Sequence, residues 1–403
     1  MKVAVFFDDV SPEKGGASSL MRTIEGELKK LKERYEIVIC YNGGSGHPYK
    51  TVKDGFEYIN ADKVRLSNLW KMFFRNAKNS LRNAGLRFFY HNERLYRESY
   101  LDYLAEKEGI DIYYFTYPAN VDLSTPFIYS LWDIGHRILP AFPDTTKPIY
   151  RWNMREEQYS RLLGKASYVL TGNETGKKEI LANYNVWPDK IRIVPFPVTF
   201  FCYGEEAKPS FELPEKYFFY PAQFWPHKNH ICIIEALEHL RKSEGLDAHV
   251  LFTGSDKGNK EYVARMAREH GVEDLVHFGG FVTYEEMKYI YTHALGMIFA
   301  SVSGPNNIPP IEAVYLKCPL IISDIPGHKE QMGDGIMYFN GYKPEELATW
   351  IRKLMTEPSA RDEALRNQEH IREEIISYSY GDRIGEILDE FAMIRRRWTT
   401  DSR

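Results

Sequence analysis

The sequence predicts an α/β protein with two Rossmann-like, doubly wound parallel-sheet domains that face a central cleft. Three observations support this fold class. Short apolar runs alternate with longer segments of helical periodicity along the 403 residues. The apolar runs are continuous instead of alternating with polar residues, which is typical of parallel strands covered by helices on both faces. A polar, proline-containing segment at 202–216 separates two series of such runs, so we expect two domains.

The first series predicts an N-terminal domain over residues 1–200. Its strands are short apolar runs, and an amphipathic helix follows the first of them. We expect the strands at 2–7, 35–41, 111–115, 127–133, 168–172 and 191–196, and the helix at 17–31.

The second series predicts a C-terminal domain over residues 201–377. Its connections have helix length, as crossovers between parallel strands require. We expect strands at 216–223, 248–255, 276–282, 296–301, 319–324 and 335–340, and helices that begin at Asn229, Asn259, Tyr284, Pro309 and Pro344. Ligands bind doubly wound sheets at the carboxyl ends of the strands, so the loops there are the candidate site.

Composition excludes several classes of protein. A net charge of -4 argues against nucleic acid as a partner. The four cysteines are scattered without paired spacing, which indicates neither a zinc site nor a disulfide framework and favours a reducing compartment. The first apolar run is too short for a signal peptide, and no segment has the length of a membrane span. We therefore expect a cytoplasmic protein that is soluble or attached to a membrane from its surface.

Gly15 and Gly16 lie between the first strand and the first helix. Glycines at this place let backbone amides approach a phosphate or a sugar. The spacing is not that of the dinucleotide fingerprint, and a plain tight turn is the alternative.

The segment YPAQFWPHKNH follows the first strand of the second domain. Lys228 begins the next helix, from which its ammonium group could reach a diphosphate, whereas Gln223 can only form hydrogen bonds. The alternative is a solvated lysine at a helix start.

The segment HFGGFVTYEE predicts a capping box between Thr283 and Glu286. Backbone groups of Phe281, Val282 and Thr283 would then line the cleft and could bind the edge of a base. Ordinary loop chemistry is the alternative.

The segment SGPNNIPPIEA has the composition of a loop that enters a helix. We expect exposed amides at Asn306, Asn307 and Ile308, where the helix N-terminus favours an anion. Glu312, one turn further on, could accept hydrogen bonds from two vicinal hydroxyls such as those of ribose. A favourable interaction of Glu312 with the helix dipole is the alternative.

The segment FIYSLWDIGHRILPAFP ends a strand of the first domain. Asp133 and His136 would face the cleft, where they could contact sugar hydroxyls or carry a proton. A structural role for His136 is the alternative.

A basic segment at 63–92 contains seven lysines or arginines, interleaved apolar residues and no acidic residue. It could bind an anionic membrane surface or a phosphate-bearing acceptor, with Arg395 to Trp398 adding to the same surface. Ordinary helices with one solvated basic face are the alternative.

Four segments of the second domain, in order and spacing, resemble the donor-binding domain of the retaining GT-B glycosyltransferases of family 4, the glycosyl transferases group 1. They are PAQFWPHKN, VLFTGS, HFGGFVTYEEM and NNIPPIEAVYLKCPLIISDIPGHKEQMGD, and the resemblance covers residues 215–356. The first domain is similar more loosely, through the Gly15–Gly16 loop, WDIGHRILPAFP and NETGKKEILANYNVWPDKIRIVPFPV. The combination resembles a bacterial surface-polysaccharide branch of the family.

The resemblance implies a hexosyltransferase that uses a UDP- or GDP-sugar donor and a glycan or lipid-linked acceptor, retains anomeric configuration and needs no metal or other cofactor. It implies that the C-terminal helix, about 378–403, packs on the first domain. The implied donor contacts are the base at 281–283, ribose at Glu312 and diphosphate at Lys228 and Gly15–Gly16, with Gln223, Ser255, Gly304 and 306–308 around them.

Three positions depart from the family pattern. Gly304 stands where a carboxylate usually meets the donor sugar, Gln223 replaces an arginine that partners the phosphate-binding lysine, and Trp132 replaces a histidine before Asp133. These departures leave two alternatives open: a catalytically impaired subunit that binds sugar nucleotides, and a GT-B sugar-nucleotide epimerase. The epimerase needs acid/base groups around the sugar, so the missing carboxylate counts against it.

Overall fold

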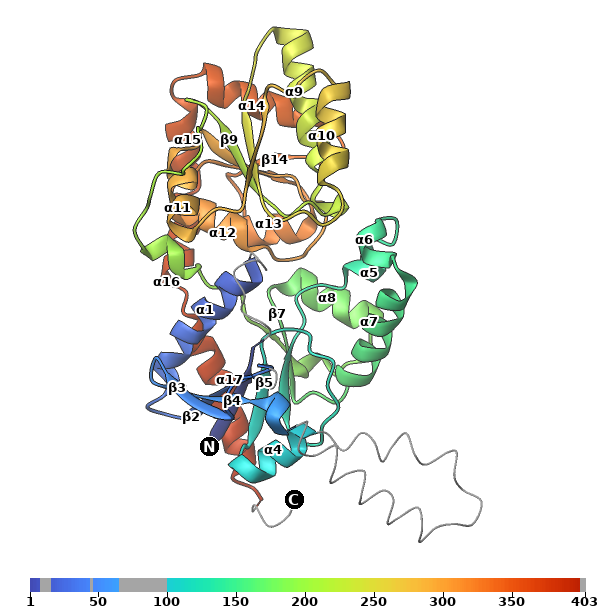
Figure 1. The fold of residues 1–403 in the computed structure, drawn as a ribbon, viewed down its shortest axis with the longest axis vertical. Coiled ribbons are helices and arrows are strands. Elements are labelled where there is room, and N and C mark those ends of the chain that lie inside the picture. The colour runs from blue at the N-terminus through green and yellow to red at the C-terminus, as the bar shows by residue number, and fades with distance from the viewer. Residues whose placement is uncertain (8–15, 44–45, 65–99, 399–403) are drawn as a thin grey trace.

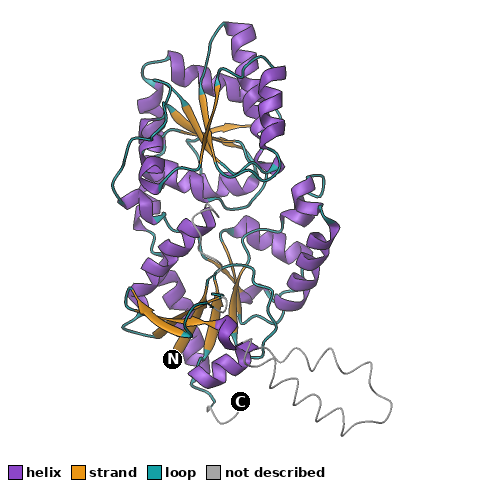
Figure 2. Ribbon diagram, in the orientation of Figure 1, coloured by secondary structure: helices purple, strands orange, loops and turns teal. Residues whose placement is uncertain are grey.

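The computed structural model describes residues 1–7, 16–43, 46–64 and 100–398, which form two domains, each built around a mostly parallel sheet (Figure 1). Helices cover both faces of each sheet (Figure 2). This arrangement confirms the predicted fold class. The basic segment at 63–92 lies almost entirely outside the described residues, as does Gly15.

The N-terminal domain contains an eight-stranded sheet in the order β3-β4-β2-β1-β5-β6-β7-β8. Neighbouring strands are parallel except β3 and β4, which are antiparallel. The strands are β1 (Lys2–Phe6), β2 (Glu36–Tyr41), β3 (Lys50–Lys53), β4 (Phe56–Asn60), β5 (Ile112–Phe115), β6 (Phe127–Ser130), β7 (Tyr168–Thr171) and β8 (Ile191–Ile193). All six strands predicted for this domain are present.

The helices of this domain include four that follow β6 and β7 in the chain and line the space between the domains. The helices are α1 (Gly16–Leu28), η2 (Lys29–Leu31), α4 (Tyr100–Glu108), α5 (Gly135–Ile138), α6 (Pro143–Thr146), α7 (Ile149–Leu162), α8 (Glu174–Asn183) and η3 (Pro188–Lys190). The short helix η4 (Phe200–Tyr203) lies in the connection to the second domain and contacts α1.

The hairpin of β3 and β4 was not predicted. Its outer strand is exposed at every residue, so it lacks the apolar run by which a buried strand is recognised. The turn carries the available signal, because Asp54 and Gly55 both have positive φ, 51° and 82°, as expected for an Asp-Gly hairpin.

The C-terminal domain contains a fully parallel sheet in the order β11-β10-β9-β12-β13-β14. The strands are β9 (Phe218–Pro221), β10 (Val250–Thr253), β11 (Val276–Gly280), β12 (Gly296–Phe299), β13 (Leu320–Ser323) and β14 (Met337–Phe339). All six were predicted. The strand order reverses between β9 and β12, which is where doubly wound sheets bind ligands beyond the carboxyl ends of their strands.

The helices of this domain include the five that were predicted, each of which begins within one residue of its expected start. The helices are η5 (Pro226–Lys228), α9 (His230–Glu244), α10 (Lys260–Glu269), α11 (Tyr284–His293), α12 (Ile308–Tyr315), α13 (Pro326–Met332), α14 (Pro344–Thr356), α15 (Ala360–Asn367) and α16 (Glu369–Ser377). No helix in the described part of the chain combines the length and the apolarity that crossing a membrane requires.

The last helix, α17 (Tyr380–Arg395), returns to the N-terminal domain and packs against α1 and η2 (Figure 1). Arg192 donates to Glu390 over 2.6 Å, and the hydroxyls of Tyr114 and Tyr380 are hydrogen-bonded in the buried core. The chain therefore crosses between the domains twice, which ties their relative position to α17 as well as to the linker.

Candidate functional site

A cavity of about 280 Å³ lies between the two domains at the carboxyl ends of their strands; we call it the cleft cavity. Its N-terminal wall comes from the loop after β6 and from α6 and α7, and its C-terminal wall from η5 and the loop after β12. It is lined by Trp132, Asp133, Gly135, Asp144, Thr145, Arg151, Arg155, Trp225, His227, Lys228, Ser303, Gly304, Asn306 and Asn307.

Lys228 is the cation that the C-terminal wall presents to this cavity. It ends η5, just before Asn229 adopts a left-handed conformation, φ 56°, and α9 begins. Its Nζ lies 3.4 Å from Ser301 Oγ and 3.5 Å from Asn307 Oδ1, and it has no ion pair within the described residues. Burial lowers the pKa of the Lys228 ammonium to about 8, although Asp133 and Asp144 oppose this shift.

The loop at 301–308 reaches the cavity with side chains more than with backbone amides. Asn306 and Asn307 are buried, and the Asn307 N–H donates to Gln331 Oε1 over 3.1 Å. The prediction of an exposed amide is therefore wrong for Asn307, because α13 supplies Gln331 to bond its N–H. Ile308 begins α12 as its first residue.

Asn306 extends from the C-terminal domain to the end of β7. Its side chain lies against Gly172, where a Cβ would come within 1.8 Å of its Nδ2, so only glycine fits there. The Asn306 amide nitrogen is buried and has no hydrogen-bond partner in the described residues. A buried donor that lines a cavity without a partner is costly unless a ligand or water satisfies it.

The two site residues predicted after β6, Asp133 and His136, lie in different surroundings. Asp133 lines the cleft cavity, and its Oδ1 accepts from the Gly135 N–H over 2.9 Å. His136 is fully buried on the inner face of α5, with Nε2 2.6 Å from Glu156 Oε1. The prediction that His136 faces the cleft is therefore wrong. Burial lowers the pKa of this imidazole, and the position suits a structural role.

The predicted base-binding loop follows β11. Thr283 caps α11 and forms the predicted capping box with Glu286, so its own N–H is already bonded to the Glu286 carboxylate over 2.8 Å. Val282 is buried, whereas the Phe281 side chain is 67% exposed. An exposed aromatic ring beside a loop backbone can stack on a planar ligand.

Residues 205–371 match the model of the glycosyl transferases group 1 family. This part of the chain is therefore similar to that family, and the match covers less than half of the 403 residues. An O-antigen chain mannosyltransferase, RfbU of Salmonella typhimurium, is 30% identical over 206 residues, which are 48% of this chain and 53% of that protein. The match thus spans about half the length of this relative.

Solved structures agree with the fold. Sucrose-phosphate synthase from Thermosynechococcus elongatus has a TM-score of 0.72 at 12% identity and covers 98% of this chain and 100% of its own. HepE of Anabaena, solved with UDP and glucose, has a TM-score of 0.64 at 13% identity over 97% of this chain and 100% of its own. Two Rossmann-like domains that face a cleft form the GT-B fold, which the resemblance implied.

Gly304, which stands where the group 1 pattern has a carboxylate, lies in the cavity wall. It has φ +100°, a conformation that favours glycine, and lines both the cleft cavity and a smaller neighbour. Its carbonyl accepts from Asn307 Nδ2 over 3.1 Å. No side chain projects into the cavity from this position.

Gln223 and Ser255, two further predicted donor-binding residues, bond to each other. Gln223 Nε2 donates to Ser255 Oγ over 3.1 Å, and its Oε1 accepts from the Trp225 indole over 3.0 Å. The Gln223 amide therefore holds Trp225 at the cavity wall instead of lining the cavity.

Glu312 lies deeper than a ligand-facing residue. It is 5% exposed and accepts hydrogen bonds from the Thr199 hydroxyl and the Tyr291 hydroxyl, both over 2.8 Å. Burial raises the pKa of the carboxyl group to about 7. Glu312 lines neither cavity described here, so in this structure it joins the interdomain connection to α11. For the predicted ribose contact, the Glu312 carboxylate would have to accept hydrogen bonds from the ribose in addition to those from Thr199 and Tyr291.

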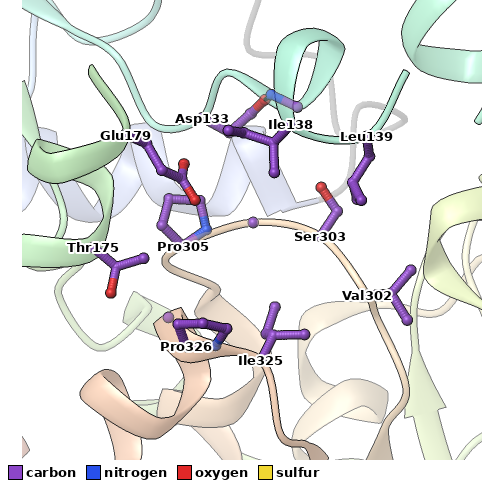
Figure 3. A pocket seen from close by; sticks show the side chains of 13 residues that line it. Asp133, Ile138, Leu139, Thr175, Glu179, Val302, Ser303, Pro305, Ile325 and Pro326 are labelled. Carbon is purple, nitrogen blue, oxygen red and sulfur yellow. Dashed lines mark hydrogen bonds between the residues drawn. The ribbon is translucent and has the colours of Figure 1, made fainter. Parts of the chain in front are cut away.

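The smaller neighbour, about 120 Å³, shares Asp133, Gly135, Ser303 and Gly304 with the lining of the cleft cavity. Asp133 and Glu179 reach it from the N-terminal domain, and Ser303 and Pro305 form the opposite side (Figure 3). Burial raises the pKa of Glu179 to about 7, with Asp133 adding to the shift. Glu179 was not predicted, because one glutamate within a charged helix carries no local signal.

Sequence reasoning also missed the pairs that hold the domains together. His227 of η5 contacts Asp144 of α6 directly across the cleft. On the other side, the Glu330 carboxylate accepts from the Glu174 N–H over 2.6 Å and the Thr175 N–H over 2.7 Å. Glu330, from α13, thus binds the N-terminus of α8. Only the fold brings these residues together, since each pair is more than 80 positions apart.

Proposed function

We propose that this protein is a retaining glycosyltransferase that moves a hexosyl group from a nucleotide sugar to a hydroxyl of a glycan or lipid-linked saccharide. The observation that carries the proposal is the unpaired, partly buried Lys228 in a cavity between the domains of a GT-B fold. The name of the relative RfbU makes mannose the first sugar to test, and the UDP of HepE makes a nucleoside diphosphate the expected leaving group.

The proposed reaction breaks the bond between the anomeric carbon and the donor diphosphate and forms a bond from that carbon to the acceptor oxygen. The acceptor proton passes to the departing phosphate oxygen on the same face of the sugar, so the configuration is retained. Negative charge develops on the diphosphate as the bond breaks. An ammonium group held in place in a dry cavity stabilises such charge more than water does.

The two walls suggest how the substrates divide. The nucleotide belongs at the C-terminal wall, where the Lys228 ammonium lies beside Asn306 and Asn307. The acceptor belongs at the N-terminal wall, where the Asp133 carboxylate faces the space beside Gly304. A carboxylate at that place can accept a hydrogen bond from the attacking hydroxyl or from the sugar, and it replaces the charge that Gly304 does not supply.

The proposal includes association with a membrane, which only the amino-acid sequence supports. The basic segment at 63–92 would bring the N-terminal wall near a lipid-linked acceptor at the inner membrane face. Co-sedimentation with vesicles that contain anionic lipid tests this, and sedimentation that does not depend on anionic lipid would remove it.

The proposed activity is tested by incubating the protein with a panel of UDP- and GDP-hexoses, with and without lipid-linked glycan acceptors. We expect one nucleoside diphosphate to be released from one donor, and the product to carry the sugar in the donor's anomeric configuration. Chelation with EDTA should leave the rate unchanged, because the proposal assigns the charge stabilisation to Lys228. A rate abolished by EDTA and restored by a divalent cation would contradict the metal-independent mechanism.

A non-catalytic sugar-nucleotide-binding subunit is the second candidate, and Gly304 is the observation that favours it. The family pattern places a carboxylate there, and this chain has only backbone. Binding of UDP or GDP without hydrolysis or transfer of any donor in the panel would support this candidate and contradict the transferase.

A further inference from the structure

The cleft cavity contains more positive charge than the C-terminal wall alone supplies. On that wall Lys228 has no ion pair with any residue that the structure describes, whereas His227 is bonded to Asp144. Gln223 adds no charge and is held by Ser255 and Trp225. A diphosphate carries at least two negative charges, so a single ammonium group leaves it incompletely neutralised.

The opposite wall has two arginines that face this space. Arg151 and Arg155 lie four residues apart on α7, so they share one face of the helix, and both line the cleft cavity. Neither guanidinium has an ion pair or a side-chain hydrogen bond within the described residues.

Neighbouring arginines show that this lack of partners is local. Arg161, on the same helix, lies 3.5 Å from Asp122 and donates to the Val121 carbonyl over 3.0 Å. Arg137, on α5, is held by Glu156 over 2.8 Å from its Nε. Arg161 and Arg137, which do not line the cavity, are therefore paired, whereas the described residues supply no such partner to Arg151 or Arg155.

The C-terminal wall also carries two amide side chains. Asn306 and Asn307 line the cavity beside Lys228, and the Asn306 amide nitrogen, which lies against Gly172, has no partner among the described residues. The cavity of about 280 Å³ has room for a phosphate or diphosphate group between the walls.

We propose that Arg151 and Arg155 form, together with Lys228, a phosphate-binding site that spans the cleft. This inference rests on the proposed function and assigns residues of the N-terminal domain to it. Arginine binds phosphate through two parallel N–H groups, so it both neutralises and orients the group. The phosphate comes either from the donor diphosphate or from a phosphate-bearing acceptor, and a phosphate bound to both walls would favour domain closure.

The test compares the full-length wild type with the double variant Arg151→Gln/Arg155→Gln by isothermal titration calorimetry. The matched control is Lys165→Gln/Lys190→Gln, which removes the same charge from the same domain; Lys165 pairs with Asp122 at the surface and Lys190 bonds the Gly164 carbonyl. The probes are inorganic pyrophosphate, UDP, GDP, and glycerol phosphate added in the presence of saturating nucleotide.

We expect the double variant to bind at least one phosphate probe roughly ten- to hundredfold more weakly than the wild type, as loss of charge-assisted hydrogen bonds implies, and the control to bind it unchanged. Weaker binding of UDP or GDP assigns the phosphate to the donor. Unchanged nucleotide affinity with lost glycerol phosphate binding assigns it to the acceptor. A second variant, Arg151→Lys/Arg155→Lys, keeps the charge and should bind with intermediate affinity.

Equal affinities of the double variant and the wild type for all four probes would overturn the site. An equal loss in the control would also overturn it, because the effect would then come from the overall charge. A wild type that binds pyrophosphate but neither UDP nor GDP contradicts the proposed function, whereas the comparison of variants with pyrophosphate still decides on the arginines.

Discussion

At the scale of single residues, two buried ionisable groups, Lys228 and Glu312, differ in the partners that surround them. Lys228 lacks an ion pair in the described structure, and burial lowers the pKa of its ammonium group to about 8. Glu312 has two hydroxyl donors, yet burial still raises the pKa of its carboxyl group to about 7. Each group is less stable as a charge in the folded protein than in water, which an unfolded chain would provide.

Replacing Lys228 should separate stability from function. The folded protein binds this proton less tightly than the unfolded chain, so between pH 8 and 10.5 stability rises with pH, and at pH 7 the charge destabilises the fold. Lys228→Met should therefore raise Tm at pH 7 while it lowers turnover by roughly a hundredfold or more. Lys242→Gln, an exposed change on α9, is the control. A lower Tm together with unchanged turnover would contradict the assignment.

Nucleotide binding should depend on pH through the same ammonium group. The charged form attracts the diphosphate, and this form is lost as pH rises through about 8. The Kd of UDP or GDP should therefore increase between pH 7 and 9 in the wild type, and change little in Lys228→Met. Calorimetry at constant ionic strength measures both, and identical profiles for the two proteins would exclude Lys228 as the titrating group.

The ionisation of Glu312 should make the protein less stable as pH rises, which is the opposite of the trend expected from Lys228. The pKa of Glu312 is higher in the folded protein than in the unfolded chain. The contribution of its protonated form to the free energy of unfolding is therefore fully present below about pH 4.5 and is lost as pH rises through about 7. Glu312→Gln should therefore flatten the fall of Tm between pH 5.5 and 8, while Glu215→Gln, in the exposed linker, should not. Parallel Tm profiles of wild type and Glu312→Gln would show that the carboxyl group does not titrate in this range.

At the scale of elements, helix ends connect the two domains. Asn173 caps α8 through its Oδ1 and also donates to the Pro305 carbonyl, and Glu330 of α13 accepts from the first two amides of the same helix. A negative charge at a helix N-terminus is favourable, so α8 of one domain is stabilised by a residue of the other. Closure of the cleft is thus coupled to the cap of α8.

Removing this cap should open the molecule. Glu330→Ala should cost about 1 kcal/mol of closed-state stability, the usual contribution of a helix cap. Small-angle X-ray scattering should then show a larger radius of gyration without ligand. Glu345→Ala, in the first turn of α14 within the C-terminal domain, removes the same charge and should leave scattering unchanged. Identical curves for Glu330→Ala and wild type would show that this contact does not hold the domains.

Elements were predictable where a continuous apolar run or a helix-start signal was present. The buried strands β9, β10, β12 and β13 and the capping box at Thr283 are of this kind. The exposed strand β3 has no apolar run, and the buried face of α5 cannot be recognised in four residues, which is why His136 was placed in the cleft. Directions of side chains in short elements depend on tertiary packing, and local periodicity does not contain them.

At the scale of the whole molecule, the site is made by two walls distant in sequence. The loop after β12 presents Gly304 and Asn306, and α7 presents Arg151 and Arg155 about 150 positions earlier. Lys228 and Asp133 could be placed in the cleft from the sequence because they follow strands at the carboxyl edge, and both line the cavity. The sequence did not identify the arginines, because their helix contacts the cavity only after the two sheets are placed facing each other.

The measurement that tests the central claim most directly is a thermal-shift panel of UDP, GDP and their hexose derivatives on the wild type and on Lys228→Met. A ligand that binds only the folded protein stabilises it by about 2.7 kcal/mol at one hundred times its Kd. We expect one nucleoside diphosphate and its sugar derivative to raise the Tm of the wild type by a few degrees, and to leave that of Lys228→Met nearly unchanged. Equal shifts in both proteins, or none in the wild type, would contradict a diphosphate site around Lys228.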